Sequence, residues 1–158
     1  MTFRPEISRL RLEIAGDREA LERQLAELAT LDLGVAHALP AAAWALHHAY
    51  SAVESILVRV ARTVEGSVPR GTDWHRDILE AARRPMPEVR PPLLGDDTVA
   101  LLQHLRGFRH FVRHGYGAVL DPEEIARHQL RAAALGPLLA RDLDVLERWI
   151  APLAGGPA

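Results

Sequence analysis

The chain has 158 residues, a length that suits one domain with a single buried core. Apolar residues make up 48% and charged residues 25% of the chain, which is too apolar for a disordered protein. Because there is no cysteine and the formal charge is −2, disulfides, thiol catalysis, cysteine-ligated zinc and a uniformly basic nucleic-acid coat are all excluded.

No apolar run is long enough to span a membrane. The charged N-terminal stretch also lacks the apolar block of a signal peptide. We therefore expect a cytoplasmic protein with no membrane partner.

Apolar periodicity predicts two long helices in the first part of the chain. In residues 5–31 apolar side chains recur in steps of three, four or seven, which marks one helical face. Gly16 and Asp17 interrupt this pattern, so the helix can kink or break there. A second helix is predicted over residues 40–65, packed along its whole length. Its regular apolar positions are Leu46, Tyr50, Val53, Leu57, Val60 and Val64.

The middle of the chain predicts a short helix, a proline-rich loop and a further long helix. Asp73 can cap the short helix, which extends to about Arg84. Its inward residues are Trp74, Ile78 and Leu79. The four prolines within residues 85–95 forbid regular structure there. Asp96 or Asp97 then caps the next helix. The predicted buried stripe of that helix consists of Leu101, Leu105, Phe108 and Val112.

The last helix begins with a strong sequence signal. Asp121 can cap it, Pro122 fits the first helical position, and Glu124 completes a capping box. Pro137 predicts a kink in the preceding turn. The apolar face of this helix consists of Ile125, Leu135, Leu139, Leu143, Leu146 and Ile150.

Together these elements predict an all-α protein. We find no alternating run of β-branched residues and no hairpin signal. Residues 1–158 are expected to form a single domain, an up-and-down bundle of four long helices plus one short helix. The tail at residues 151–158 is expected to fray.

The densest polar cluster lies at the end of the third long helix. The stretch RGFRHFVRHGY holds three arginines, two histidines and a tyrosine. Arg109 and Arg113 are neighbours at i, i+4, and so are His110 and His114. No acidic residue occurs in residues 101–120. The cluster is therefore a local positive site on a slightly negative protein, and it suits a phosphate-bearing partner.

This cluster has the groups needed for RNA cleavage by the 2′-hydroxyl group. Gly115 is predicted to end the helix, which places His114 in the last turn. A histidine that titrates near neutrality can give or take the proton, and arginine can stabilise the phosphorane. Because the nucleophile belongs to the substrate, the reaction requires no metal and no other cofactor.

The pattern Arg109-x4-His114-x-Tyr116 resembles the signature of the HEPN superfamily. It is most similar to that of the HepT-like toxins, which are paired with minimal nucleotidyltransferase antitoxins. Further blocks of the resemblance follow in order between residues 40 and 125. They are Tyr50 to Glu54, Trp74-His75 with Ile78-Leu79, Arg90-Pro91, Phe108 to His110, and Leu120-Asp121.

The resemblance implies an α-helical homodimer in which two motif copies form one cleft that cuts RNA without a metal. It implies that Arg109 stabilises or positions the phosphate and that His114 transfers the proton, with His110 as a polar helper. We also predict that Arg113, one turn from Arg109, supports the site. It also implies that the partner nucleotidyltransferase attaches AMP to Tyr116 and so silences the nuclease. We therefore predict an endoribonuclease toxin whose partners are RNA, a second copy of the chain and the nucleotidyltransferase antitoxin.

Other interpretations of the same residues stay open. Arg109 and Arg113 can be solvated or paired with acids on a neighbouring helix. His110 and His114 can form a metal pair, although the flanking arginines repel a cation. Glu54 is predicted to be a buried structural acid that supports the site by orienting one of the two arginines.

Two residues and two functions complete these expectations. Trp74 is predicted to lie in the core. His75 can contact RNA, but it is more typical of a capping or surface residue. An alternative function is a non-catalytic helical docking subunit for a nucleotidyltransferase or another nucleotide-bearing partner. A further alternative is a structural bundle in which the Arg/His cluster is incidental.

Overall fold

The structure is a computed structural model that describes residues 4–114 and 119–155, with backbone only for residues 109–114. The described part contains α1 (Pro5–Thr30), α2 (Ala38–Val60), α3 (Trp74–Ala82), α4 (Asp96–His114) and α5 (Pro122–Ile150). It contains no β-strand, and an isolated bridge joins Met86 to Arg90. The prediction of an all-α fold is confirmed.

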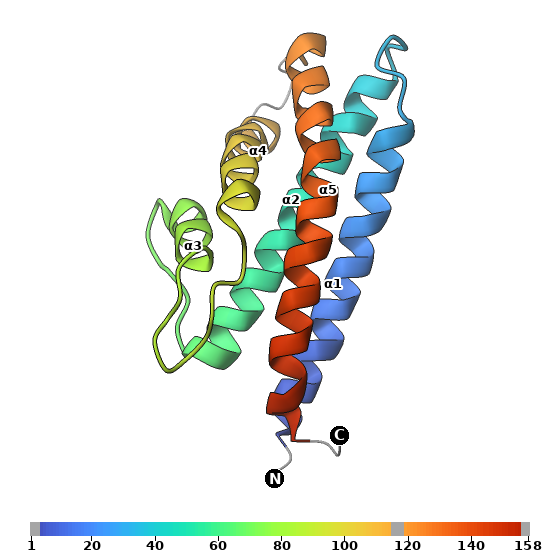
Figure 1. Ribbon diagram of the computed structural model, residues 1–158. Helices are drawn as coiled ribbons and strands as arrows, with labels where there is room; N and C mark the ends of the chain where they lie inside the picture. Colours follow the sequence, from blue (N-terminus) through green and yellow to red (C-terminus); the bar gives the residue numbers. More distant parts are fainter. Residues whose placement is uncertain (1–3, 115–118, 156–158) are drawn as a thin grey trace.

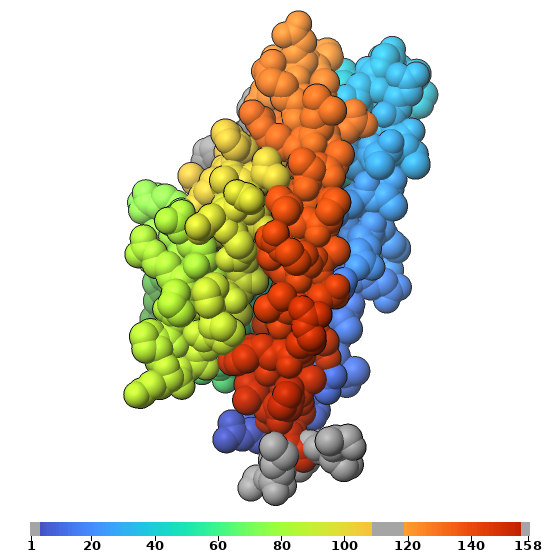
Figure 2. All heavy atoms as spheres, viewed as in Figure 1, coloured from blue at the N-terminus to red at the C-terminus, as the bar shows by residue number. Residues whose placement is uncertain are grey.

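The four long helices lie side by side in an up-and-down bundle, and the short α3 packs at one side (Figure 1). α2 contacts each of the other four helices. α5 runs along the length of the visible face, with α1 on one side and the α3–α4 region on the other (Figure 2). In this arrangement α4 packs against both α5 and α2.

The core lies where the predicted apolar stripes meet. In α2 the predicted Leu46, Tyr50, Val53, Leu57 and Val60 are all buried. The predicted face of α5 is also confirmed, because each of its six apolar residues is buried. Burial of such stripes stabilises the bundle by about 25 cal/mol for each Å² of apolar surface removed from water.

The first helix differs from the prediction because α1 continues through Gly16 and Asp17 without a break. Asp17 accepts a hydrogen bond from Nε of Arg59 on α2 at 2.7 Å. This bond raises the pKa of Arg59 above its ordinary value. Leu21 is buried beyond this point as Ile14 is before it, so both halves of α1 pack on the same core.

The second helical segment begins earlier and ends differently than predicted. α2 starts at Ala38, so Pro40 lies in its first turn, where a missing N–H is tolerated. The segment reaches Glu65 as predicted, but its last part, Ala61–Glu65, is a π-helix. Gly66 ends it with a φ of 78°, a left-handed conformation that favours glycine.

The start of α4 is capped by another helix. We predicted Asp96 or Asp97 as the cap, but α4 begins at Asp96 itself. The buried Asp142 of α5 instead accepts a hydrogen bond from the backbone N–H of Gly95 at 2.9 Å and from Oγ1 of Thr98 at 2.5 Å. The carboxylate thus fixes the start of α4 against α5.

The buried stripe of α4 is rotated slightly from the prediction. Leu105 and Phe108 are buried as predicted, but Val99 and Leu102 join them in place of Leu101, which is half-buried. The side chain of Val112 lies outside the described residues.

At α5 the predicted cap is confirmed, because the Asp121 carboxylate accepts a hydrogen bond from the backbone N–H of Glu123 at 2.9 Å. α5 then continues through Pro137 as one helix. The fraying predicted after it is wrong for Ala151–Ala154, which form a 3-10 helix. The carbonyl of Ala154 accepts a hydrogen bond from the N–H of Arg4 at 3.1 Å, and this bond ties the segment to the start of α1.

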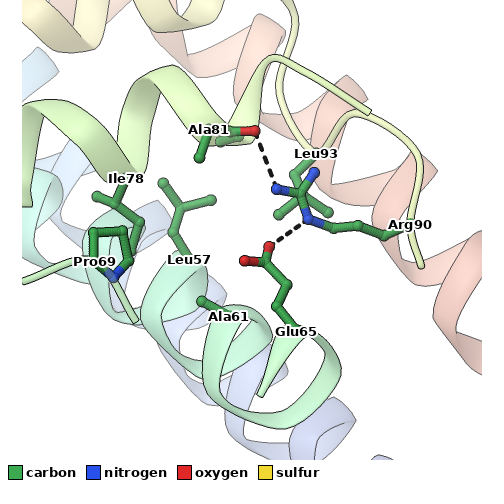
Figure 3. A pocket seen from close by; sticks show the side chains of 9 residues that line it. Leu57, Ala61, Glu65, Pro69, Ile78, Ala81, Arg90 and Leu93 are labelled. Carbon is green, nitrogen blue, oxygen red and sulfur yellow. Dashed lines mark hydrogen bonds and ion pairs between the residues drawn. The ribbon is translucent and has the colours of Figure 1, made fainter. Parts of the chain in front are cut away.

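The proline-rich loop forms no helix, as predicted, but a buried arginine holds it in place (Figure 3). Nε of Arg90 donates to the carboxylate of Glu65. The other two guanidinium nitrogens donate to the carbonyls of Arg84 at 2.8 Å, Pro91 at 3.1 Å and Ala81 at 3.1 Å. The guanidinium therefore satisfies the hydrogen-bonding needs of carbonyls at the end of α3, and it joins the proline-rich loop to the π-helix.

Candidate functional site

The residues predicted to carry chemistry lie on the last turns of α4. The helical backbone extends to His114, so it carries Arg109, His110, Arg113 and His114. The register of this helix puts Arg109 with Arg113, and His110 with His114, one turn apart on a shared face. Their side chains lie outside the described residues, and so does all of Tyr116.

Phe108 fixes how this end of α4 packs on α5. Its ring is buried, and its centroid lies 4.8 Å from that of His128 on α5. Before it, Nε of Arg106 donates to the side chain of Gln103 at 2.8 Å. The positive cluster therefore begins where α4 is still anchored in the core.

Glu54 on α2 is buried, as predicted, and binds a histidine of α3. Its Oε2 lies 2.6 Å from Nδ1 of His75, and the two side chains are 9% and 20% exposed. A buried carboxylate needs such a partner, because removing an unpaired charge from water costs several kcal/mol, on the order of the desolvation penalty of an ion. The predicted contact of Glu54 with Arg109 or Arg113 involves side chains outside the described residues and stays a prediction.

The prediction for His75 is wrong, because this residue is neither a cap nor a surface group. It is half-buried and joins α3 to α2 through Glu54. Trp74 packs against the core, and its ring lies on the imidazole with centroids 3.7 Å apart and planes inclined by 31°. The imidazole is therefore held by a carboxylate at its edge and by an indole at its face.

His128, the histidine beside Phe108, had no predicted role. His128 is buried, and its Nδ1 lies 3.3 Å from Nη1 of Arg131. Burial lowers the pKa of His128, and the charges of Arg131 and His104 lower it further, while Glu124 at 3.7 Å opposes them. The neutral imidazole therefore accepts the Arg131 hydrogen bond at Nδ1. A sign of its burial was present in the sequence, because His128 shares the apolar face of α5 with Ile125, Ala132 and Leu135.

Neither a three-residue metal site nor a membrane-spanning helix occurs among the described residues. No three His, Asp or Glu side chains within 4–108 and 119–155 are grouped so that they could hold a metal ion. No helix in the described ranges is long and apolar enough to cross a membrane. The arrangement instead gathers arginine and histidine positions at one end of α4, with a carboxylate–imidazole pair on the adjoining helices.

Comparison with known proteins identifies a matching family. The profile of the family described as HepT-like protein matches residues 41–150, which include all of α3, α4 and α5 and nearly all of α2. No curated protein and no solved structure matches the chain significantly.

Proposed function

Because the chain belongs to the HepT-like family of HEPN proteins, we propose that it is a metal-independent endoribonuclease toxin. The family match carries this proposal, since it spans residues 41–150 and contains the complete pattern Arg109-x4-His114-x-Tyr116. The helical backbone of α4 from Asp96 to His114 supports it, because one continuous helix fixes the spacing of the arginine and the histidine.

In the proposed reaction the 2′-hydroxyl of RNA attacks the adjacent phosphate and the 5′-oxygen leaves. His114 takes the proton from the 2′-hydroxyl and delivers it to the departing 5′-oxygen, and Arg109 stabilises the added negative charge of the phosphorane. His110 and Arg113 support them by hydrogen bonding and by positive charge. Arginine suits this role because its planar donors match phosphate oxygens and its charge persists at any physiological pH.

The proposed site is completed by a second copy of the chain. A two-fold axis beside the ends of the two α4 helices brings two copies of the motif to one cleft. A light-scattering mass equal to that of two chains is the expected result. A mass of 17.5 kDa at the working concentration contradicts the shared cleft.

The proposed silencing acts at Tyr116 through a partner nucleotidyltransferase. An AMP group two residues from His114 adds bulk and negative charge beside the arginines, and it competes there with the RNA phosphate. Co-expression with the nucleotidyltransferase is expected to add one or more AMP units to the intact mass. A mass gain that survives the change Tyr116→Phe contradicts this site.

The nuclease is tested by cleavage of single-stranded RNA in the presence of a chelator. Both Arg109→Ala and His114→Ala are expected to abolish cleavage and to relieve growth arrest after induced expression. The matched control is His104→Ala, because His104 is an exposed histidine of the same helix and precedes the motif. Unchanged toxicity in the two motif variants refutes the assignment. RNA binding without any cleavage by the unaltered chain favours the docking-subunit alternative.

A further inference from the structure

We propose that Glu54 and His75 are positioning residues of the ribonuclease site, which hold the motif-bearing end of α4 from α2 and α3. This inference rests on the proposed function. His75 lies outside the Arg-x4-His-x-Tyr pattern and is brought to this region only by the fold.

The first observation is that the imidazole of His75 has a fixed orientation. The carboxylate of Glu54 engages Nδ1 at 2.6 Å, and the ring of Trp74 lies against the imidazole with centroids 3.7 Å apart. Two contacts on different parts of the ring leave it little freedom to rotate. Such fixed side chains are what a site needs when neighbouring groups must be held within about 0.5 Å of the productive geometry.

The second observation is the register between α3 and α4. Nε of Arg83 lies 3.6 Å from the carboxylate of Asp96, and Oε1 of Glu80 accepts a hydrogen bond from Gln103 at 3.3 Å. Earlier residues of α3 therefore lie beside later residues of α4. Continued toward the start of α3, this antiparallel register places His75 beside the part of α4 that follows Gln103, where the motif begins.

The third observation is the charge of the helices that meet here. Glu54 is the sole acidic residue of α2, which packs directly on α4. Residues 101–120 contain no acid, so a carboxylate that orients the motif arginines must come from another element. Glu54 is the carboxylate that α2 can offer to the motif, and its 2.6 Å contact with Nδ1 of His75 restricts its orientation.

A contact that only held α2 and α3 together would not require a carboxylate–imidazole pair. Replacing a buried ionic pair by apolar residues of similar volume is often neutral or stabilising, so the pair by itself is weak evidence for a role in stability. The buried residues of α2 closest to Glu54 in sequence, Val53, Ile56 and Leu57, are apolar. An apolar contact with α3 at this position would serve packing equally well, which points to positioning as the role of the pair.

The experiment measures kcat and KM for cleavage of a fluorogenic single-stranded RNA oligonucleotide by the full chain. His75→Leu and Glu54→Gln are each expected to lower kcat by on the order of 10- to 100-fold with little change in KM, because misplacement of catalytic groups slows the chemical step. His75→Gln keeps an N–H donor for Glu54 and is expected to restore most of kcat. A structural role alone does not predict this rescue.

The matched control is Arg83→Ala, which removes the ion pair between the end of α3 and Asp96 of α4 without touching Glu54 or His75. It is expected to keep the wild-type kcat. All variants are assayed well below their own melting temperatures, so that a change in kcat does not reflect unfolding. Wild-type kcat in His75→Leu overturns the inference, and so does a failure of His75→Gln to exceed His75→Leu. A wild-type chain that cuts no RNA overturns the proposed function, and this inference with it.

Discussion

Two buried carboxylates join α2 and its π-helical extension to the α3 region, and their surroundings differ. Glu65 binds Arg90, whose remaining N–H groups donate hydrogen bonds to backbone carbonyls of α3 and of the loop after it (Figure 3). Glu54 binds His75, and the ring of Trp74 stacks on the His75 imidazole. His75 belongs to α3, which packs against α4. Burial and charge alone therefore do not separate a structural pair from a positioning pair. The elements that surround each pair provide the distinction.

The largest expected effect comes from removing the Glu65–Arg90 pair, the structural one of the two. Arg90→Leu leaves Glu65 buried without its cation and leaves backbone carbonyls without donors. We expect the free energy of unfolding to fall by about 3–5 kcal/mol, measured by urea denaturation. Below the melting temperature, kcat for RNA cleavage is expected to stay near that of the wild type.

The matched control for Arg90 is Arg84→Ala, because Arg84 is an exposed arginine just after the end of α3. Its effect is expected to stay within about 0.5 kcal/mol. A loss of kcat in folded Arg90→Leu as large as that in His75→Leu would remove the distinction between the two pairs.

A third carboxylate sharpens the comparison because it lies at the other end of α4. Asp142→Ala leaves the N–H of Gly95 and the hydroxyl of Thr98 without their acceptor. We expect the free energy of unfolding to fall by about 1–3 kcal/mol, with kcat unchanged below the melting temperature. Differential scanning calorimetry together with the cleavage assay measures both quantities.

Asp144→Ala is the control for Asp142, because Asp144 is an exposed residue of α5 that pairs with Arg18 at 2.7 Å. Its expected effect is under about 1 kcal/mol. Equal losses of stability in the two variants would show that the cap on α4 has no special weight.

The smallest expected effect concerns His128, a buried imidazole whose Nε2 lies 3.7 Å from the carboxylate of Glu124. Its pKa is lowered below the ordinary value of 6.5 by burial and by Arg131. The unfolded chain therefore takes up a proton before the folded chain does. Above about pH 6.5 this titration does not change the free energy of unfolding. As the pH falls below that value, the free energy of unfolding decreases.

His128→Gln removes this titration and keeps an acceptor for Arg131. Urea midpoints measured between about pH 8 and about pH 5 are expected to fall less in this variant than in the wild type. An identical pH dependence in both proteins would mean that the folded His128 is not held neutral.

The helices were predictable because their signals are local. In α2 the spacing of Leu46, Tyr50, Val53 and Leu57 repeats with the period of a helix, and these residues are buried together. The cap of α5 was predictable for a similar reason, since Asp121 and Pro122 are adjacent in the chain. Patterns within one turn of a helix carry enough information to place the helix and its buried face.

The contacts that arrange the site were not predictable, because they join residues far apart in the chain. Asp142 caps α4 across a separation of 44 residues from Thr98, and Glu54 meets His75 across 21 residues. Neither pair has a local signal of its partner. The burial of His128 did have a local signal, because a histidine on the apolar stripe of α5 is expected to be buried and held neutral by desolvation.

The most direct test of the proposed nuclease is cleavage of an RNA oligonucleotide with and without a single 2′-deoxy nucleotide. The mechanism uses the 2′-hydroxyl of the substrate, so the unmodified RNA should be cut in the presence of a chelator to a 2′,3′-cyclic phosphate. The same oligonucleotide should resist cutting when the nucleotide on the 5′ side of the scissile phosphate lacks that hydroxyl. Equal cleavage of both oligonucleotides, or cleavage that persists in His114→Ala, would contradict the account.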